Sequence, residues 1–129
     1  MWNQSGPVRY EDLLTLLPER MPVLRDACHQ LGTLWQAEKP PTHVLYGDVF
    51  NPHVRALIDG SDQGGLREAF DFIELLASSS DDRVNELTEV TICEYLAHLP
   101  DAAARVRHLM GPRTAILLQR ALLTRKDAV

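Results

Sequence analysis

The sequence has little of what secreted, membrane-spanning and disulfide-stabilised proteins carry. It contains only two cysteines, Cys28 and Cys93, which lie far apart in the chain. No segment reaches the roughly 18 uninterrupted apolar residues of a membrane span. The first residues also lack the basic start and apolar run of a secretory signal. We therefore expect a cytoplasmic protein without membrane contact, in which both thiols are reduced and buried rather than joined in a disulfide.

Motifs of catalysis and of cofactor binding are also absent. The chain has no G-x-S-x-G motif, no P-loop, no H-E-x-x-H and no C-x-x-C pair. A carboxylate–imidazole metal site can be drawn from Glu94 and His98, four residues apart on one predicted helix. Glu94 lies in an otherwise apolar segment, so we expect a salt bridge from it to Arg113 or Arg120 instead. The sequence predicts no metal, no cofactor and no enzymatic activity.

The net charge of −5 is unevenly distributed along the chain. Residues 44–101 hold twelve acids and three basic residues, whereas residues 102–129 hold six basic residues and one acid. So acidic a segment repels phosphate backbones, and we expect no nucleic-acid partner. A protein with a basic surface would be attracted instead.

Apolar residues recur at intervals of three and four through most of the chain, which is typical of amphipathic helices. No strand-like alternation competes with this pattern except in the short stretch HVLYGDVF. A length of 129 residues suits one domain. We predict an all-α fold of six to seven helices, arranged as an antiparallel bundle or a HEAT-like stack of helix pairs. Residues 1–41 would hold N-terminal helices and a Pro-Pro connector, and residues 42–129 the helical core.

Prolines mark the predicted helix ends. Pro18 is expected to stop the first helix, and Pro22 to open the second. Asn51 followed by a proline looks like a helix cap with a first-turn proline, although that helix can also begin earlier, near Val44 or Asp48.

Two successive predicted helices carry acids along their polar sides. The acids are Glu68, Asp71 and Glu74 on the first helix, Asp82, Glu86 and Glu89 on the second, and Asp59, Asp62 and Asp81 in the adjoining turns. The ordinary interpretation is a solvated face with local pairs such as Arg83 with Glu86, or one neutralised by the basic C-terminal region. The alternative is a recognition surface. In that case, charge reversal at Asp71, Glu74 and Glu86 together would abolish binding and leave helicity intact.

Three stretches carry a resemblance to a known family. They are HVLYGDVFNPHVRALIDG, LREAFDFIELLASSSDDRVNELTEVTICEYL and MGPRT, within residues 43–114. They resemble a family of small all-helical bacterial proteins that are similar to the immunity proteins of polymorphic or contact-delivered toxin systems. The resemblance implies a helical fold, a toxin as partner and no catalytic residues.

The leading hypothesis is a stoichiometric inhibitor whose acidic faces bind a cognate toxin domain with a basic surface, because complementary charge speeds and selects such encounters. Tyr46 and Phe50 either supply the apolar anchors of that interface or lie in the core. Two alternatives stay open. One is a generic helical adaptor or scaffold, or a homodimer, that uses an apolar groove. The other is a small metal-dependent hydrolase built on Glu94 and His98.

Overall fold

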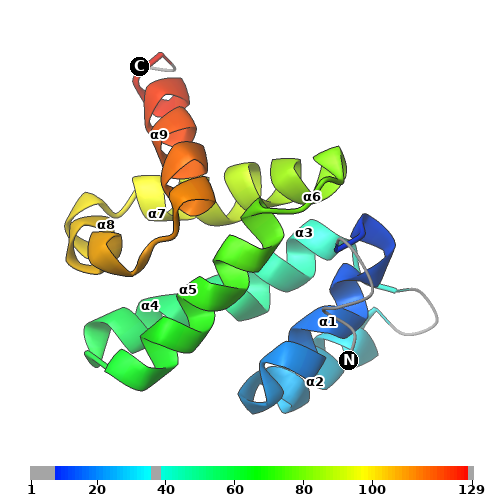
Figure 1. The fold of residues 1–129 in the computed structure, drawn as a ribbon. Helices are drawn as coiled ribbons and strands as arrows, with labels where there is room; N and C mark the ends of the chain where they lie inside the picture. The colour runs from blue at the N-terminus through cyan, green and yellow to red at the C-terminus, as the bar shows by residue number, and fades with distance from the viewer. Residues whose placement is uncertain (1–7, 36–38, 128–129) are drawn as a thin grey trace.

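The computed structural model describes residues 8–35 and 39–127, and helices account for most of this part of the chain (Figure 1). The helices are α1 (Leu13–Arg20), α2 (Arg25–Leu34), α3 (Thr42–Leu45), α4 (Asn51–Asp59), α5 (Gln63–Ala77), α6 (Asp82–Leu87), α7 (Glu94–Ala97), α8 (Pro100–Val106) and α9 (Pro112–Asp127). Within these two ranges there is no strand, and seven helices result when α3–α4 and α6–α7 are each counted as one continuous helix. The predicted all-α class with six to seven helices is confirmed.

Pro18 does not end the first helix, contrary to the sequence expectation. α1 follows a short 3-10 turn (Tyr10–Asp12) and holds Pro18 inside it. A proline removes one helical hydrogen bond and crowds the preceding turn, but its fixed φ suits the helical residues that follow. Leu13 and Leu17 are fully buried in the core, and this burial offsets the cost of the proline. Pro22 opens the next helical segment, as predicted.

α3 and α4 form one helix over residues 42–59, joined by a π turn (Tyr46–Phe50). The helix begins at Thr42, ahead of every start that the sequence suggested. Asn51 is therefore not a cap. Its side chain is buried, and its Nδ2 donates a hydrogen bond to the backbone oxygen of Thr91 at 2.9 Å, which ties this helix to the one over residues 82–97.

α6 and α7 are joined in the same way, by a second π turn (Thr88–Cys93), into a helix over residues 82–97. In an α-helix a residue four positions on lies about 40° further round, so apolar residues at constant four-residue spacing leave the core face. The wider π turn, with i→i+5 hydrogen bonds, takes up this drift. Both helices show such spacing in their buried residues: Thr42, Tyr46, Phe50, Val54 and Ile58 in the first, and Val84, Thr88, Ile92 and Leu96 in the second.

Tyr46 and Phe50 lie in the core, so the interpretation of these residues as surface anchors is wrong. Both side chains are 0% exposed. Their rings pack with that of Phe72, at centroid distances of 6.3 Å for Tyr46 and 5.6 Å for Phe50. The Tyr46 hydroxyl donates to the backbone oxygen of Leu13 at 2.9 Å, which satisfies the one polar atom of this buried ring.

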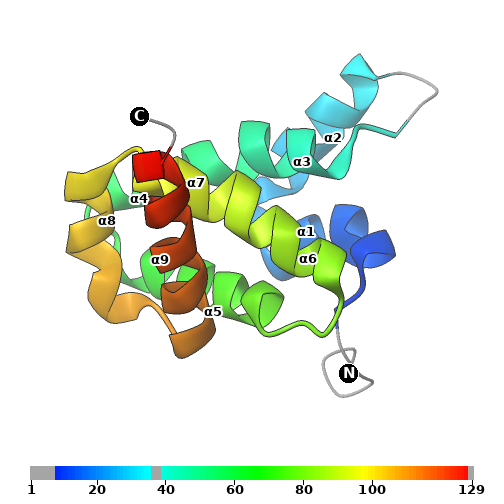
Figure 2. The same ribbon diagram turned by 90° about the horizontal axis from the view of Figure 1, so that it is seen from above.

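One apolar core extends from Val8 to Ala121 and includes residues of α1, so the N-terminal segment shares the core of the later helices. α4 lies beside α5, and α9 packs against both α5 and α7 (Figure 1). α2 lies at the periphery (Figure 2) and has no fully buried residue, while Leu34 at its end is 77% exposed. In the described ranges, no helix has the length and apolar character needed to cross a membrane.

Both cysteines are free thiols, as predicted. Cys93 is fully buried as predicted, whereas Cys28 is only half-buried, contrary to the expectation that both thiols are buried. Burial raises the pKa of Cys93 to about 12, with a smaller contribution from the nearby Glu89 carboxylate. Its thiol therefore stays protonated and behaves as a small apolar side chain.

Candidate functional site

The two predicted rows of acids exist, but one member of each row turns toward α9. The first two acids of each row are exposed: Glu68, Asp71, Asp82 and Glu86. The third acid, Glu74 in α5 and Glu89 in the second π turn, is less exposed and contacts α9. The exposed acidic surface therefore contains fewer than the nine carboxylates that the sequence predicts for it.

Glu74 caps the N-terminus of α9. Its carboxylate accepts hydrogen bonds from the backbone nitrogens of Arg113 at 3.1 Å and Thr114 at 2.9 Å. It also accepts one from the Thr114 hydroxyl at 2.8 Å. The first N–H groups of a helix have no partner within the helix and carry partial positive charge, so a carboxylate placed there stabilises the helix. Glu74 belongs to the fold rather than to a free surface.

Glu89 forms a salt bridge with Arg120 of α9, at 3.1 Å between Oε1 and Nη2. The sequence predicted that Arg120 or Arg113 would pair with Glu94, and this is wrong. The 82–97 helix turns Glu89 rather than Glu94 toward the arginine. The Arg120 side chain is 61% exposed, so solvent screens the pair and its contribution is below about 1 kcal/mol.

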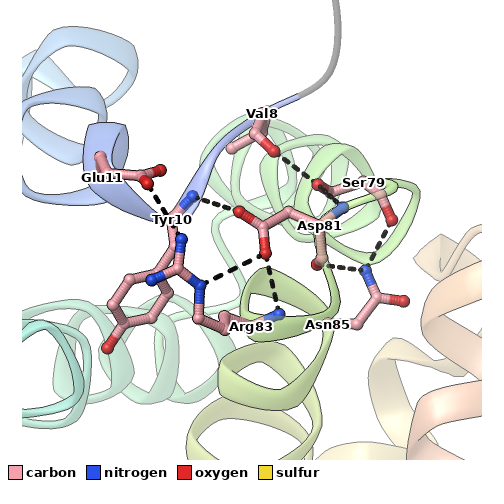
Figure 3. Close-up of polar contacts among 7 residues, drawn as sticks. All are labelled: Val8, Tyr10, Glu11, Ser79, Asp81, Arg83 and Asn85. Carbon is pink, nitrogen blue, oxygen red and sulfur yellow. Dashed lines mark hydrogen bonds and ion pairs between the residues drawn. The ribbon is translucent and has the colours of Figure 1, made fainter.

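Asp81 fastens the start of the described chain to the turn between α5 and α6 (Figure 3). It caps α6 by accepting from the backbone nitrogen of Arg83 at 2.9 Å, and it accepts from the backbone nitrogen of Tyr10 at 2.8 Å. The Ser79 hydroxyl donates to the backbone oxygen of Val8. We call the group formed by these residues, with Glu11 and Asn85, the N-terminal clasp.

Arg83 completes the N-terminal clasp through its side chain. It pairs with Glu11 at 3.0 Å and with Asp81 at 3.7 Å, and its guanidinium lies 4.9 Å from the centroid of the Tyr10 ring. The predicted pair of Arg83 with Glu86 is wrong, because the guanidinium pairs with Glu11 and Asp81 instead. Asp81 is thereby excluded from any free acidic surface.

Because the N-terminal clasp contains the ionised carboxylate of Asp81, we expect the folded protein to lose stability in acid. The hydrogen bond from the Tyr10 nitrogen holds the pKa of Asp81 below its ordinary value of 3.8, with further lowering by Arg83. A carboxyl whose pKa is lowered on folding contributes stability above its unfolded pKa and loses it as pH falls through the folded pKa. We expect the urea midpoint of Asp81→Asn to change less than that of the wild type between about pH 4 and about pH 2. Equal changes in both, with Asp48→Asn as control, would contradict this role.

Asp59 and Asp62 are also used locally. Asp59 pairs with Arg55 four residues earlier in α4, at 3.2 Å, and both side chains are exposed. Asp62 caps α5 by accepting from the backbone nitrogen of Gly65 at 3.0 Å. These contacts are of the ordinary kind that end one helix and begin the next.

Four predicted acids have neither an ion pair nor a helix-capping contact to any residue in the described ranges: Glu68, Asp71, Asp82 and Glu86. Glu68 and Asp71 line a hollow of about 340 Å³ together with Arg20, the last residue of α1. Glu86 lines a second hollow of about 240 Å³ together with Tyr10, which precedes α1. The two hollows therefore lie at opposite ends of α1 and do not form one continuous site.

The second hollow contains residues that the sequence did not single out. Its lining consists of Tyr10, His43, Arg83, Glu86, Leu87, Val90 and Thr91, and we call it the clasp groove. Val90 is 51% exposed there, although its spacing groups it with the apolar face of the helix. The second π turn changes the winding after Leu87 and so turns Val90 outward. In the sequence, the only sign of this π turn is the run of core-facing residues at constant four-residue spacing.

The Glu94 carboxylate and the His98 imidazole are not arranged as the drawn metal site requires. The Nδ1 atom of His98 lies 2.7 Å from the backbone oxygen of Glu94, so the imidazole is directed at the main chain rather than at the carboxylate. In the part of the chain that the structure covers, no group of three histidine, cysteine or acidic side chains could hold a metal ion.

Comparison with known proteins gives a family and no function. No curated protein and no solved structure matches the chain. A family model described as "Domain of unknown function (DUF7674)" matches residues 10–124, from Tyr10 of the N-terminal clasp to Thr124 in α9. Because this match covers most of the 129 residues, the chain belongs to the DUF7674 family.

Proposed function

We propose that the protein is a non-enzymatic protein-binding domain that recognises a partner with a basic surface. The observation that carries the proposal is that four exposed acids on two successive helices have no ion pair or helix-capping contact among the described residues: Glu68, Asp71, Asp82 and Glu86. Unpaired carboxylates on helix surfaces raise the encounter rate with a basic partner and disfavour acidic ones. The same charge disfavours nucleic acid.

The resemblance to immunity proteins suggests the class of partner. An immunity protein binds a toxin domain one to one and blocks a site that is often basic, which an acidic helical surface suits. We therefore propose a toxin domain as the cognate protein. The domain encoded beside the gene for this chain is the first candidate to test.

Charge reversal tests the proposal. The structure alters the choice of residues to replace. Glu74 is unsuitable because it holds α9, so the variant combines Asp71→Lys, Asp82→Lys and Glu86→Lys. We expect the affinity for the candidate toxin domain, measured by titration calorimetry, to fall by about 10- to 30-fold, and wild-type binding to weaken with added salt.

The matched control is Glu19→Lys, Asp26→Lys and Asp48→Lys, which changes the net charge equally at three exposed acids elsewhere. Circular dichroism should show the same helicity in both variants. Equal loss of affinity in both would mean that only net charge matters, and unchanged affinity in the first would reject the acidic surface.

A homodimer is the alternative that one observation favours. Val23 in the 3-10 turn before α2 and Leu34 at the end of α2 are 68% and 77% exposed, and Trp35, the next residue, is 38% exposed. Sedimentation of the purified protein as a monomer would reject this alternative.

A further inference from the structure

The clasp groove combines an apolar floor with an acidic side. Val90 is 51% exposed in it, next to the buried Leu87 and the half-buried Tyr10. Glu86 is exposed on the same helix, one turn before Val90. A surface with an exposed aliphatic side chain, an aromatic ring and a carboxylate can offer a partner both apolar packing and an ion pair.

The charges around the groove leave it negative. Arg83 is its one arginine, and Glu11 and Asp81 already neutralise that guanidinium at 3.0 Å and 3.7 Å. His43 of α3 also lines the groove and is exposed. Because Arg83 pairs with those two acids, Glu86 has no ion pair within the described ranges. Asp82, one turn earlier, adds a second unpaired charge.

The groove is also held in shape by the N-terminal clasp. The backbone nitrogen of Tyr10 is bonded to Asp81, and its ring lies against the guanidinium of Arg83 (Figure 3). A side chain that is fixed before binding loses less conformational entropy when a partner arrives. Tyrosine and arginine are also the residue types most enriched among the contacts that dominate interface energies.

We propose that the clasp groove is the docking site of the partner, and that it takes a segment in which an aliphatic side chain neighbours an arginine or lysine. The aliphatic side chain packs on Val90 and Leu87, and the cation pairs with Glu86. This proposal rests on the proposed function, to which it adds the site and the chemistry of the partner. Charge complementarity with Glu86 and Asp82 is the reason for a basic segment rather than another apolar occupant.

The hollow beside α5 fits such a partner less well. Arg20 and Arg67 line it together with Glu68 and Asp71, so both signs of charge are present. Its apolar lining residue, Phe72, is 1% exposed and offers little surface for packing.

The test uses three short synthetic peptides that alternate leucine with arginine, leucine with glutamate, and serine with arginine. Each is titrated into the full-length protein while amide chemical shifts are followed by two-dimensional NMR. We expect the leucine–arginine peptide to shift amides around Tyr10, Glu86 and Val90. We expect Glu86→Lys and Val90→Ser each to weaken its binding by about tenfold, the ratio that one well-packed contact supplies. Glu19→Lys, an exposed acid of α1 that lines neither hollow, is the matched control and should leave binding unchanged.

The outcomes separate the two proposals. If the leucine–arginine peptide shifts amides near Glu68 and Asp71 but not near Val90, the groove is wrong and the acidic surface stands. Equal binding of the serine–arginine peptide would reject the apolar part of the groove. Equal binding of the leucine–glutamate peptide, or no shift with any peptide, would overturn the groove proposal. In either case, an intact response of toxin affinity to the triple charge reversal would still support the proposed function.

Discussion

Replacing Phe50 by alanine is expected to lower the free energy of unfolding by about 3–5 kcal/mol, the largest stability effect that we predict. The side chain is 0% exposed, and its ring meets that of Phe72 edge to face at 5.6 Å and that of Tyr46 at 6.0 Å. The variant loses this burial and leaves a cavity that its neighbours fill only in part. Urea unfolding followed by circular dichroism measures the loss.

Two variants control the interpretation of Phe50. Phe50→Leu keeps most of the apolar volume and is expected to cost less than the alanine variant. Tyr46→Phe removes only the hydrogen bond to the Leu13 oxygen and is expected to cost about 1 kcal/mol. A loss below about 1 kcal/mol for Phe50→Ala would show a surface residue and restore its interpretation as an interface anchor.

Glu74→Ala is expected to destabilise the protein by about 2–3 kcal/mol, although Glu74 lies in a row that looks like a solvent face. The substitution leaves the nitrogens of Arg113 and Thr114 and the Thr114 hydroxyl without their acceptor. Thr114 is 0% exposed, so water does not readily replace the lost partner. Urea unfolding of Glu74→Ala beside Glu74→Gln, which keeps one acceptor oxygen but loses the charge, separates hydrogen bonding from electrostatics.

Gly111 provides an independent check on Glu74. A Cβ atom added at Gly111 would collide with the carboxyl end of Glu74, which its hydrogen bonds hold in place. We expect Gly111→Ala to be destabilising in the wild type and less so in Glu74→Ala, where the obstructing carboxylate is absent. Additive losses in the double variant would show that Glu74 does not occupy this position in solution.

Helix positions were largely predictable from the sequence because the determinants are local. Pro22 opens a helical turn as predicted, and Asp81 caps α6 by accepting a hydrogen bond from the backbone nitrogen of Arg83, two residues on. The continuation of α1 through Pro18 was not predictable, because the burial of the leucines around this proline depends on packing against distant helices. Propensity decides helix ends only where tertiary contacts are weak.

The candidate site was less predictable because its determinants are distant in the chain. Glu74 meets Thr114 across 40 residues, and Asp81 meets Tyr10 across 71. Charge patterning shows that carboxylates share a helix face, but it does not show which of them a later helix covers. Glu68 and Glu74 therefore look alike in sequence, whereas one is exposed and the other caps α9.

The two π turns have a consequence for changes in chain length. Each wide turn accommodates a residue that a regular α-helical turn would not, and Asp48 in the first of them is exposed. Exchanging Asp48 for another polar residue therefore disturbs little. Deleting one residue there would restore regular α-helical winding and leave Val54 and Ile58 facing the core. A deletion within the regular turns of α4 would instead rotate the residues that follow by about 100°. The π turns are thus the places where these helices can lose one residue and keep their buried side chains in register.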